Sequence, residues 1–360
     1  MVSRTPPELE SPPRIAVVVP CYRVSRQVGD LLRRIGPEVW RVYCVDDACP
    51  EQSGRAVEAA AADDPRIRLL VHSNNQGVGG AVVTGYRQAI EDGAEVIVKL
   101  DGDGQMDPAL IPNLLAPLLN GEADYVKGNR FFRLEGLMSM PFARLVGNAG
   151  LSFLSKMSTG YWTLFDPTNG YTAIHAAVAR ELPLDKLSRR YFFETDILFR
   201  LNTLRAVVAD LPMEARYGDE KSSMNLWRIL GMFPWLHLRN TAKRLFYNYF
   251  LRDFSIATVH LLVGIVLVLF GVIFGGYHWI QAQHLARFAS AGTVMLAGLP
   301  VILGTQLLLN FLSMDMTNIP RDPLHRRLPG RRITPVLLDL RRLDAAAAEE
   351  AELLEYRKSA

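Results

Sequence analysis

The stretch Val96-Ile-Val-Lys-Leu-Asp-Gly-Asp-Gly-Gln105 decides the fold of this chain of 360 residues. It starts as a short apolar run, which is typical of a strand buried on both faces, and it ends in two carboxylates. Similar apolar runs occur earlier, at residues 15–19, 41–45 and 67–71. Segments with helical character separate the runs, at residues 24–34, 53–62 and 79–91. This alternation of strand and helix predicts an α/β fold with an open, mostly parallel sheet.

The loops that follow the predicted strands form the candidate site, because open parallel sheets bind ligands beyond the carboxyl ends of their strands. Asp46 and Asp47 follow the second run, and Asp101 and Asp103 follow the fourth. Two like charges held close together need a cation or a strong set of hydrogen-bond donors. Oxygen ligands favour a hard ion such as Mg²⁺ or Mn²⁺, which substrate phosphates often share. Asp101 and Asp103 therefore predict a site for a divalent cation.

Residue spacing and composition exclude several other kinds of protein. An EF-hand starting at Asp101 needs Gly at its sixth position and Glu at its twelfth, where this chain has Met106 and Pro112. A dinucleotide-binding fingerprint starting at Gly77 reaches Val82 where its last glycine should stand. The net charge of +3 is too small to indicate a nucleic-acid-binding protein. The hydrophobic fraction of 49% excludes a disordered chain.

The C-terminal third of the chain contains two long apolar runs. Neither residues 254–286 nor residues 288–314 include an Asp, Glu, Lys or Arg. Each run exceeds the ~20 residues that cross a bilayer core, so we expect two transmembrane helices. Between them, residues 275–279 and 281–287 predict a short turn with interfacial aromatic residues. Basic residues cluster outside the two runs and only Arg287 lies between them, so the positive-inside rule predicts that both termini are cytosolic.

The segment before the first apolar run has amphipathic character. Apolar residues recur at helical spacing after Pro234, while Arg239, Lys243 and Arg244 take other faces. This pattern predicts a helix at the membrane interface, and a helix packed on the catalytic domain is the alternative. The expected segments are a disordered lead-in at 1–13, an α/β domain at 14–224, juxtamembrane amphipathic helices at 225–253, transmembrane helices at 254–315 and a cytoplasmic tail at 316–360.

The order of four motifs resembles one known family. The motifs are Val-Val-Val-Pro-x-Tyr at 17–22, Val-Asp-Asp at 45–47, Asn-x-Gly at 75–77 and Asp-x-Asp-x-Gln at 101–105. The set resembles the family 2 glycosyltransferases, which have the Rossmann-like GT-A fold. The last motif, followed by two C-terminal transmembrane helices, is similar to the dolichol- and polyprenyl-phosphate sugar synthases. The resemblance covers residues 14 to about 224 by motif and the membrane hairpin by architecture.

The resemblance implies a role for each matching residue. The nucleotide would be bordered or held by Pro20, Tyr22, Asp46, Asp47, Asn74 and Gly77. The metal and the donor diphosphate would be gathered by Asp101, Asp103 and Gln105. The acceptor phosphate would be bound by Arg130 and Arg144. A loop that closes over the donor diphosphate would contribute a further cation, either Arg216 or Lys221. The chain departs from the family at Arg23-Val24, where Asn-Glu is usual, so a guanidinium replaces a carboxylate near the nucleotide.

The resemblance implies an inverting transfer of a hexose-type sugar from a nucleotide-diphosphate donor to polyprenyl phosphate, undecaprenyl or dolichyl, for cell-envelope glycan or glycoconjugate synthesis. A lipid phosphate has a second pKa of ~6 and is already an anion at neutral pH, so no strong general base is needed. We then expect Glu194 and Asp196 to position the substrates rather than to deprotonate the acceptor. Two alternatives stay open: a membrane glycosyltransferase with a saccharide hydroxyl acceptor, and a non-catalytic membrane scaffold that binds nucleotide sugars.

The expected partners are the nucleotide-sugar donor, polyprenyl phosphate and the lipid bilayer, with no nucleic acid. The expected location is the inner (cytoplasmic) membrane, crossed more than once, with the catalytic domain and both termini in the cytosol. Related membrane synthases can assemble as tetramers, so the resemblance also raises a homo-oligomer as an expectation.

Overall fold

The computed structural model describes residues 12–130, 142–213 and 226–329. Its centre is a seven-stranded sheet with the strand order β3-β2-β1-β4-β6-β5-β7. The first four strands are parallel: β1 (Ile15–Cys21), β2 (Arg41–Asp46), β3 (Ile67–Val71) and β4 (Val96–Lys99). The others are β5 (Tyr125–Asn129), β6 (Thr172–His175) and β7 (Val208–Pro212), of which β6 runs antiparallel to β4 and β5. The predicted mostly parallel α/β sheet is confirmed.

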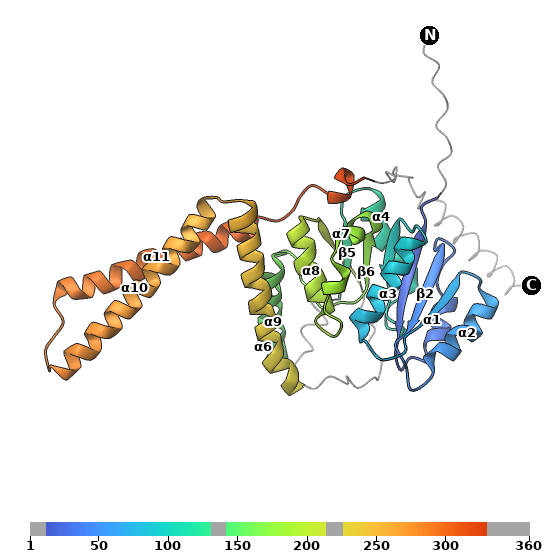
Figure 1. Ribbon diagram of the computed structural model, residues 1–360, viewed down its shortest axis with the longest axis horizontal. Coiled ribbons are helices and arrows are strands. Elements are labelled where there is room, and N and C mark those ends of the chain that lie inside the picture. Colours follow the sequence, from blue (N-terminus) through green and yellow to red (C-terminus); the bar gives the residue numbers. More distant parts are fainter. Residues whose placement is uncertain (1–11, 131–141, 214–225, 330–360) are drawn as a thin grey trace, which may run out of the picture.

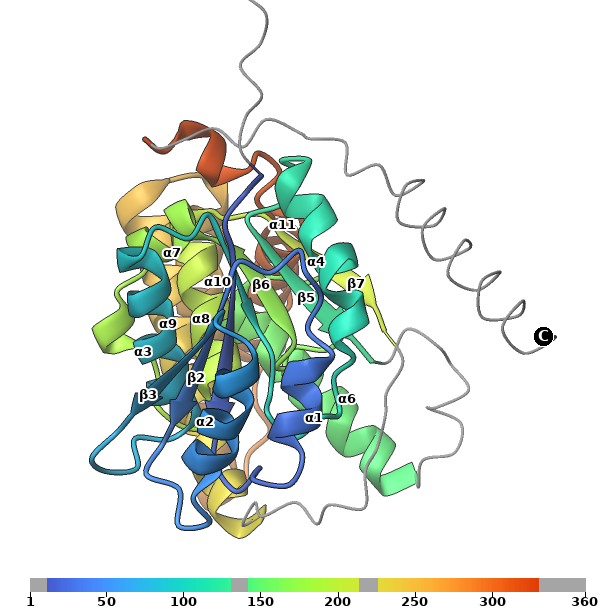
Figure 2. The same ribbon diagram turned by 90° about the vertical axis from the view of Figure 1, so that its right-hand side faces the viewer.

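Helices cover both faces of the sheet, because side chains along each strand alternate between two cores. In β1, Val17 and Val19 belong to one core and Ala16 and Val18 to the other. The first core also contains residues of α1 (Val28–Arg33), α2 (Ser53–Asp63) and α4 (Ile111–Leu119). The second contains residues of α3 (Val78–Glu91), α7 (Ala176–Glu181) and α8 (Phe193–Leu204). Figure 2 shows α1 and α4 on one side of the strands and α3, α7 and α8 on the other.

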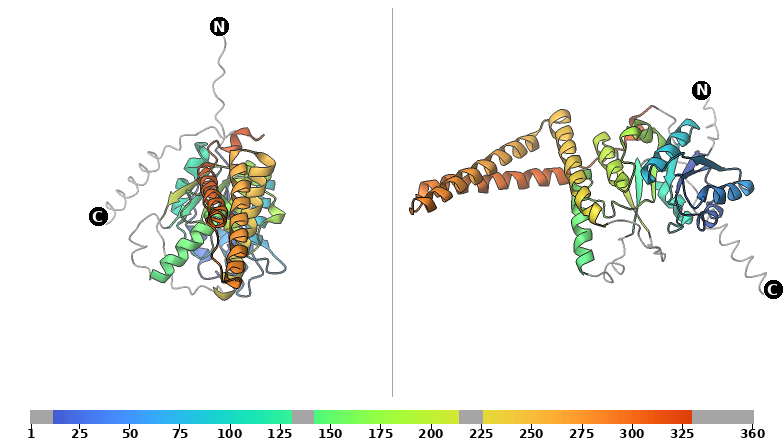
Figure 3. Two further views of the ribbon diagram at one scale, coloured as in Figure 1. Left: turned by 90° about the vertical axis from the view of Figure 1, so that its left-hand side faces the viewer. Right: turned by 60° about the horizontal axis from the view of Figure 1, so that its bottom comes forward.

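Two long apolar helices follow the catalytic domain: α10 (Ile256–His284) and α11 (Ala291–Thr317). They pack against each other as a hairpin that projects away from the sheet, drawn in orange in Figure 3. Glycines allow this close packing, since a β-carbon at Gly264 would lie 3.1 Å from the carbonyl oxygen of Gly304. The same addition at Gly271 would lie 2.6 Å from the carbonyl oxygen of Ala297.

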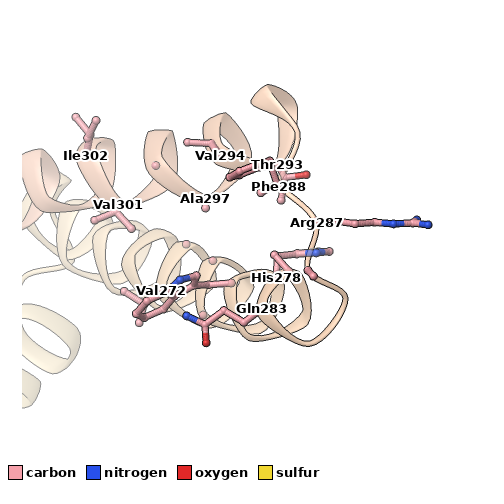
Figure 4. A pocket seen from close by; sticks show the side chains of 18 residues that line it. Val272, His278, Gln283, Arg287, Phe288, Thr293, Val294, Ala297, Val301 and Ile302 are labelled. Carbon is pink, nitrogen blue, oxygen red and sulfur yellow. The ribbon is translucent and has the colours of Figure 1, made fainter.

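The predicted turn at 275–279 is wrong, because α10 continues through these residues and the connection lies at 285–290. Glycine and aromatic residues do not by themselves end a long apolar helix, because the helix satisfies its backbone hydrogen bonds within the segment. Near this connection, a pocket of about 960 Å³ lies between the two helices. Figure 4 shows Val272 and His278 on one side of it and Ala297 and Val301 on the other.

The segment before the hairpin forms α9 (Leu226–Phe246), followed by a π-helical turn, η3 (Tyr247–Arg252). α9 lies beside α6 (Phe142–Thr159), as Figure 1 shows, and it buries polar residues against the domain while Trp235 and Leu238 are exposed. The helix therefore packs on the catalytic domain and keeps an exposed apolar side. The sequence predicted that Arg244 lies on an exposed cationic face, and this is wrong. Arg244 is buried and paired with Asp315 of α11. Helical periodicity alone does not reveal a partner on a distant helix.

The chain returns to the catalytic domain after the hairpin. The short helix η4 (Leu324–Arg327) docks beside β5 through the fully buried carboxylate of Asp124. The backbone amides of Leu324 and His325 donate to this carboxylate at 2.7 and 2.8 Å. The first part of the expected tail is thus anchored to the domain, so the hairpin is tied to the domain at both of its ends.

Candidate active site

A pocket of about 730 Å³ lies at the carboxyl ends of β1, β2 and β4. Six of the residues that the sequence singled out line it together: Pro20, Tyr22, Asp47, Gly77, Asp101 and Asp103. These residues come from four different loops, and the parallel strands bring those loops to one edge of the sheet. The pocket is therefore the place where the predicted nucleotide and metal residues meet.

Asp47 fixes the shape of one wall of the pocket. Its carboxylate accepts hydrogen bonds from the backbone amides of Gln76 at 2.8 Å and Gly77 at 2.7 Å. The Nδ1 atom of the buried His72 lies 2.8 Å from the same carboxylate. Gly77 has a φ of 87°, a conformation that glycine adopts without strain. Asp47 therefore holds the β3–α3 loop against the end of β2.

Two of the predicted nucleotide residues do not line the pocket. Both carboxylate oxygens of Asp46 are taken by backbone amides, those of Cys49 at 2.7 Å and Gly54 at 2.6 Å. Asp46 thus shapes the loop that leads into α2. Asn75 lines the pocket in place of Asn74, and its side-chain amide donates to the carbonyl oxygen of Asp47 at 3.2 Å.

A buried lysine lies directly beneath the acidic loop. The ammonium group of Lys99 is 2.8 Å from Asp101 Oδ1 and 3.2 Å from Glu194 Oε1. Burial alone would lower the pKa of Lys99, but the two carboxylates raise it above its usual range, so the lysine stays charged. A side chain at Gly170 would collide with Asp101, so Asp101 is confined on a second side. The sequence did not single out Lys99, because a lysine within an apolar run gives no sign of its partners.

The carboxylates of Asp101 and Asp103 are oxygen donors of the kind that Mg²⁺ and Mn²⁺ prefer. Asp103 Oδ1 accepts the backbone amide of Gln105 at 3.0 Å, while the Gln105 side chain does not line the pocket. Within the described ranges there is no group of three or more His, Cys, Asp or Glu that could hold a metal ion. A cation held by Asp101 and Asp103 would therefore take its remaining ligands from a substrate and water.

Arg130 follows β5 and is engaged by a carboxylate. Its Nε donates to Asp166 Oδ2 at 2.8 Å and its Nη2 to Asp166 Oδ1 at 3.1 Å. Burial would raise the pKa of Asp166, but the hydrogen bonds and charge of Arg130 lower it. Beneath the pair, burial lowers the pKa of Lys127 to about 8, and this lysine donates to the carbonyl oxygen of Asn169. Arg130 is thus held in place by a bidentate ion pair.

Other predicted residues lie outside the part of the chain that the structure describes. This applies to Arg216 and Lys221, and to the side chain of Arg144 on α6. Six lining residues were not among the predicted site residues: Arg23 and Val24, which the sequence marked as a departure from the family, Asn75 and Val78, and finally Arg190 and Tyr191. Nothing in the local sequence indicated the last two, because they reach the pocket across a contact between distant loops.

The comparisons with known proteins concern the family of this chain. The profile described as "Glycosyl transferase family 2" matches residues 16–182. An undecaprenyl-phosphate mannosyltransferase of Micrococcus luteus is 31% identical over 216 residues, which cover 58% of this chain and 88% of the relative. A UDP-N-acetylglucosamine–dolichyl-phosphate N-acetylglucosaminyltransferase of Methanococcus voltae is 24% identical over 218 residues, which cover 57% of this chain and 86% of the relative.

Among solved structures, the mannosyltransferase PcManGT from Pyrobaculum calidifontis, in complex with GDP-Man and Mn²⁺, has a TM-score of 0.44 and 16% identity. The match covers 81% of this chain and 88% of that one.

Proposed function

This chain belongs to glycosyltransferase family 2, and we propose that it is an inverting transferase that moves a hexose-type sugar from a nucleotide-diphosphate donor to polyprenyl phosphate, undecaprenyl or dolichyl. The observation that carries the proposal is the pocket in which Asp47, Asp101 and Asp103 meet, on a chain with two helices long enough to cross a bilayer. Relatives named for transfer to undecaprenyl or dolichyl phosphate support the acceptor class. The product would serve cell-envelope glycan or glycoconjugate synthesis.

On the donor side, the residues of the pocket have separate tasks. Pro20 and Tyr22 border the nucleoside, and Asp47 keeps the wall with Gly77 in shape. Asp101 and Asp103 would hold Mg²⁺ or Mn²⁺, which stabilises the negative charge of the leaving nucleotide diphosphate. Arg216 or Lys221 would add a cation to the same diphosphate. Lys99 keeps the carboxylate of Asp101 in position through their 2.8 Å contact.

On the acceptor side, no strong base is required, since a phosphate monoester with a second pKa of ~6 is already an oxyanion at neutral pH. Glu194 is suited to positioning, because the ammonium group of Lys99 lies 3.2 Å from its carboxylate and holds it in place. Arg130 and Arg144 are the proposed cations for the lipid phosphate, and the bidentate pair with Asp166 keeps the guanidinium of Arg130 in a fixed orientation. In-line attack by the phosphate oxygen would invert the anomeric configuration of the sugar.

The proposed location is the cytoplasmic membrane, with α10 and α11 crossing it and the catalytic domain in the cytosol. Basic residues flank the outer ends of the hairpin, among them Lys243 before α10 and Arg321 after α11, whereas its tip carries only Arg287. Labelling of Gln283→Cys by an impermeant thiol reagent in intact cells tests this topology. Labelling of a cysteine placed at residue 329 instead would reverse it. A tetramer is the proposed assembly, and the mass of the complex in detergent measures it.

The experiment for the function is incubation of the purified full chain with polyprenyl phosphate, Mg²⁺ and a panel of UDP- and GDP-sugars. We expect a lipid product heavier by one sugar with at least one donor. Transfer to an oligosaccharide but not to the lipid would favour the saccharide hydroxyl acceptor. Donor binding with no transfer to either acceptor would favour the non-catalytic scaffold.

A further inference from the structure

The loop at residues 187–192 forms one wall of the pocket and is held in place by hydrogen bonds of its backbone to α3 and α8. The amide of Ser188 donates to Asp196 Oδ2 at 3.0 Å, which ties the loop to α8. The carbonyl oxygen of Arg189 accepts the amide of Gly80 at 3.2 Å, which ties it to the first turn of α3. The following Phe192 is buried. The loop therefore has a defined position relative to the pocket.

Two glycines of α3 and its preceding loop allow this loop to come close. A β-carbon at Gly77 would lie 2.5 Å from the carbonyl oxygen of Arg189 and 2.9 Å from Arg190 Cγ. A β-carbon at Gly79 would collide with the carbonyl oxygen of Ser188. The aliphatic part of Arg190 thus lies over Gly77, and Arg190 lines the pocket together with Asp101 and Asp103.

The guanidinium of Arg190 has no hydrogen-bond or ion-pair partner among the residues that the structure describes. The carboxylates on the same pocket have partners: Asp47 has backbone amides and His72, and Asp101 has Lys99. The other lining arginine, Arg23, lies with its guanidinium carbon 5.5 Å from the ring centroid of Tyr22. The backbone of Arg190 is therefore held in place by its loop, while the N–H donors of its guanidinium remain available to a ligand.

We propose that Arg190 binds the diphosphate of the nucleotide donor, at the point where its stem crosses Gly77. This assignment rests on the proposed function, since it requires a nucleotide diphosphate in this pocket. A diphosphate brought next to Asp101 and Asp103 is repelled by both carboxylates, and a cation on the opposite side of the anion offsets that cost. A planar guanidinium suits the task because it can bind two phosphate oxygens at once.

The test is nucleotide binding to the purified full chain in detergent with Mg²⁺, measured by calorimetry. The probes are uridine, UMP and UDP, and guanosine, GMP and GDP. For the diphosphate that binds, we expect Arg190→Ala to weaken affinity roughly tenfold or more, as for a charge-assisted contact, with little change for the nucleoside. Arg190→Lys should recover part of the affinity. The matched control is Arg189→Ala, the adjacent exposed arginine whose side chain does not line the pocket and whose loop contact is made by its backbone.

Several outcomes would overturn the assignment. Diphosphate binding by Arg190→Ala at wild-type affinity would do so, as would an equal loss from Arg189→Ala or an equal loss of nucleoside binding. The result is separable from the proposed function: a wild-type chain that binds the diphosphate through Arg190 but transfers no sugar would keep this assignment and refute the transferase. Failure of the wild-type chain to bind either diphosphate would contradict both.

Discussion

Two clusters of charge in this chain are built in opposite ways. In the pocket at the carboxyl ends of the strands, Arg190 is exposed and no described residue engages its guanidinium. At the joint between the catalytic domain and the hairpin, Arg244 is buried and all of its nitrogen atoms are engaged. It donates to both oxygens of Asp315, at 2.7 and 2.9 Å, and to the carbonyl oxygen of Met157.

The joint connects four parts of the molecule. Asp315 of α11 also accepts hydrogen bonds from the hydroxyl of Tyr249 in η3 at 2.8 Å and from Trp162 Nε1, after α6, at 2.9 Å. Arg244 belongs to α9, so the network ties both α9 and η3 to α11. A fully paired buried charge thus holds elements together, whereas a pocket cation that no described residue engages is available to a ligand. Breaking the first should affect stability, and breaking the second should affect binding or turnover.

The largest expected effect is at the joint. Arg244→Ala leaves the buried carboxylate of Asp315 unpaired and should lower the free energy of unfolding by about 3–5 kcal/mol. Replacing both partners, as Arg244→Met with Asp315→Leu, should recover most of the loss. Denaturation in detergent measures the change, with Arg239→Ala on an exposed position of α9 as the control, expected within about 0.5 kcal/mol of wild type. Equal losses from the two arginines would refute the special role of the joint.

In the pocket, the largest effect is expected at the metal site. Asp103→Asn removes an ion ligand without changing volume, so turnover should fall roughly a hundredfold or more while the thermal unfolding midpoint stays unchanged. Asp107→Asn is the matched control, because Asp107 lies in the same loop but pairs with Arg34 at 2.7 Å, outside the pocket lining. Excess chelator should abolish the activity of the wild-type chain. Full activity of Asp103→Asn, or of the wild type in chelator, would remove the metal from the account.

A pH effect is expected where α9 meets α6. Burial lowers the pKa of His237 to about 4, and its Nδ1 lies 2.8 Å from the hydroxyl of Ser158. The unfolded chain binds a proton below pH ~6.5 that the folded chain resists, so stability should fall as the pH drops from ~6.5 towards 4. At pH 5 this residue should cost about 2 kcal/mol. His237→Gln should show a smaller loss of thermal stability between pH 7.5 and 5; an identical loss would contradict the assignment.

The smallest expected effect concerns the acceptor phosphate. Arg130→Lys keeps a positive charge beside Asp166 but loses the planar fork, so the acceptor kcat/KM should fall about tenfold with the donor KM little changed. Lysine is preferred over alanine here, because alanine would leave the fully buried Asp166 without its bidentate partner. Kinetics with lipid varied at saturating donor, and then the reverse, separate the two substrates. A change in donor KM alone would place the phosphate site elsewhere.

Much of this arrangement could be predicted from the sequence, because it depends on local patterns. Apolar runs predict strands, and the residues after each strand must meet at one edge of a parallel sheet, as Asp47, Asp101 and Asp103 do. Long runs without charge likewise predict α10 and α11. The ends of elements were less predictable, since glycine and aromatic residues within α10 look like a turn when the partner helix is unknown.

What could not be predicted depends on contacts between distant segments. Arg244 and Asp315 are separated by 71 residues, and the periodicity of α9 alone favours an exposed position for Arg244. Arg190 reaches the pocket only because its loop crosses Gly77 and Gly79. Asp46 and Asp47 look equivalent in sequence, yet Asp46 accepts the amides of the loop that leads into α2, whereas Asp47 accepts those of the β3–α3 loop and lines the pocket.

In the proposed reaction the nucleophile is a lipid phosphate rather than a hydroxyl. The direct measurement is a competition in which the full chain, Mg²⁺ and the preferred nucleotide sugar are given equal amounts of polyprenyl phosphate and unphosphorylated polyprenol of the same length. Mass spectrometry of the extracted lipids then identifies the product. We predict that the sugar appears only on polyprenyl phosphate, and that Asp103→Asn removes this product. Transfer to polyprenol, or to both lipids at similar rates, would contradict the account.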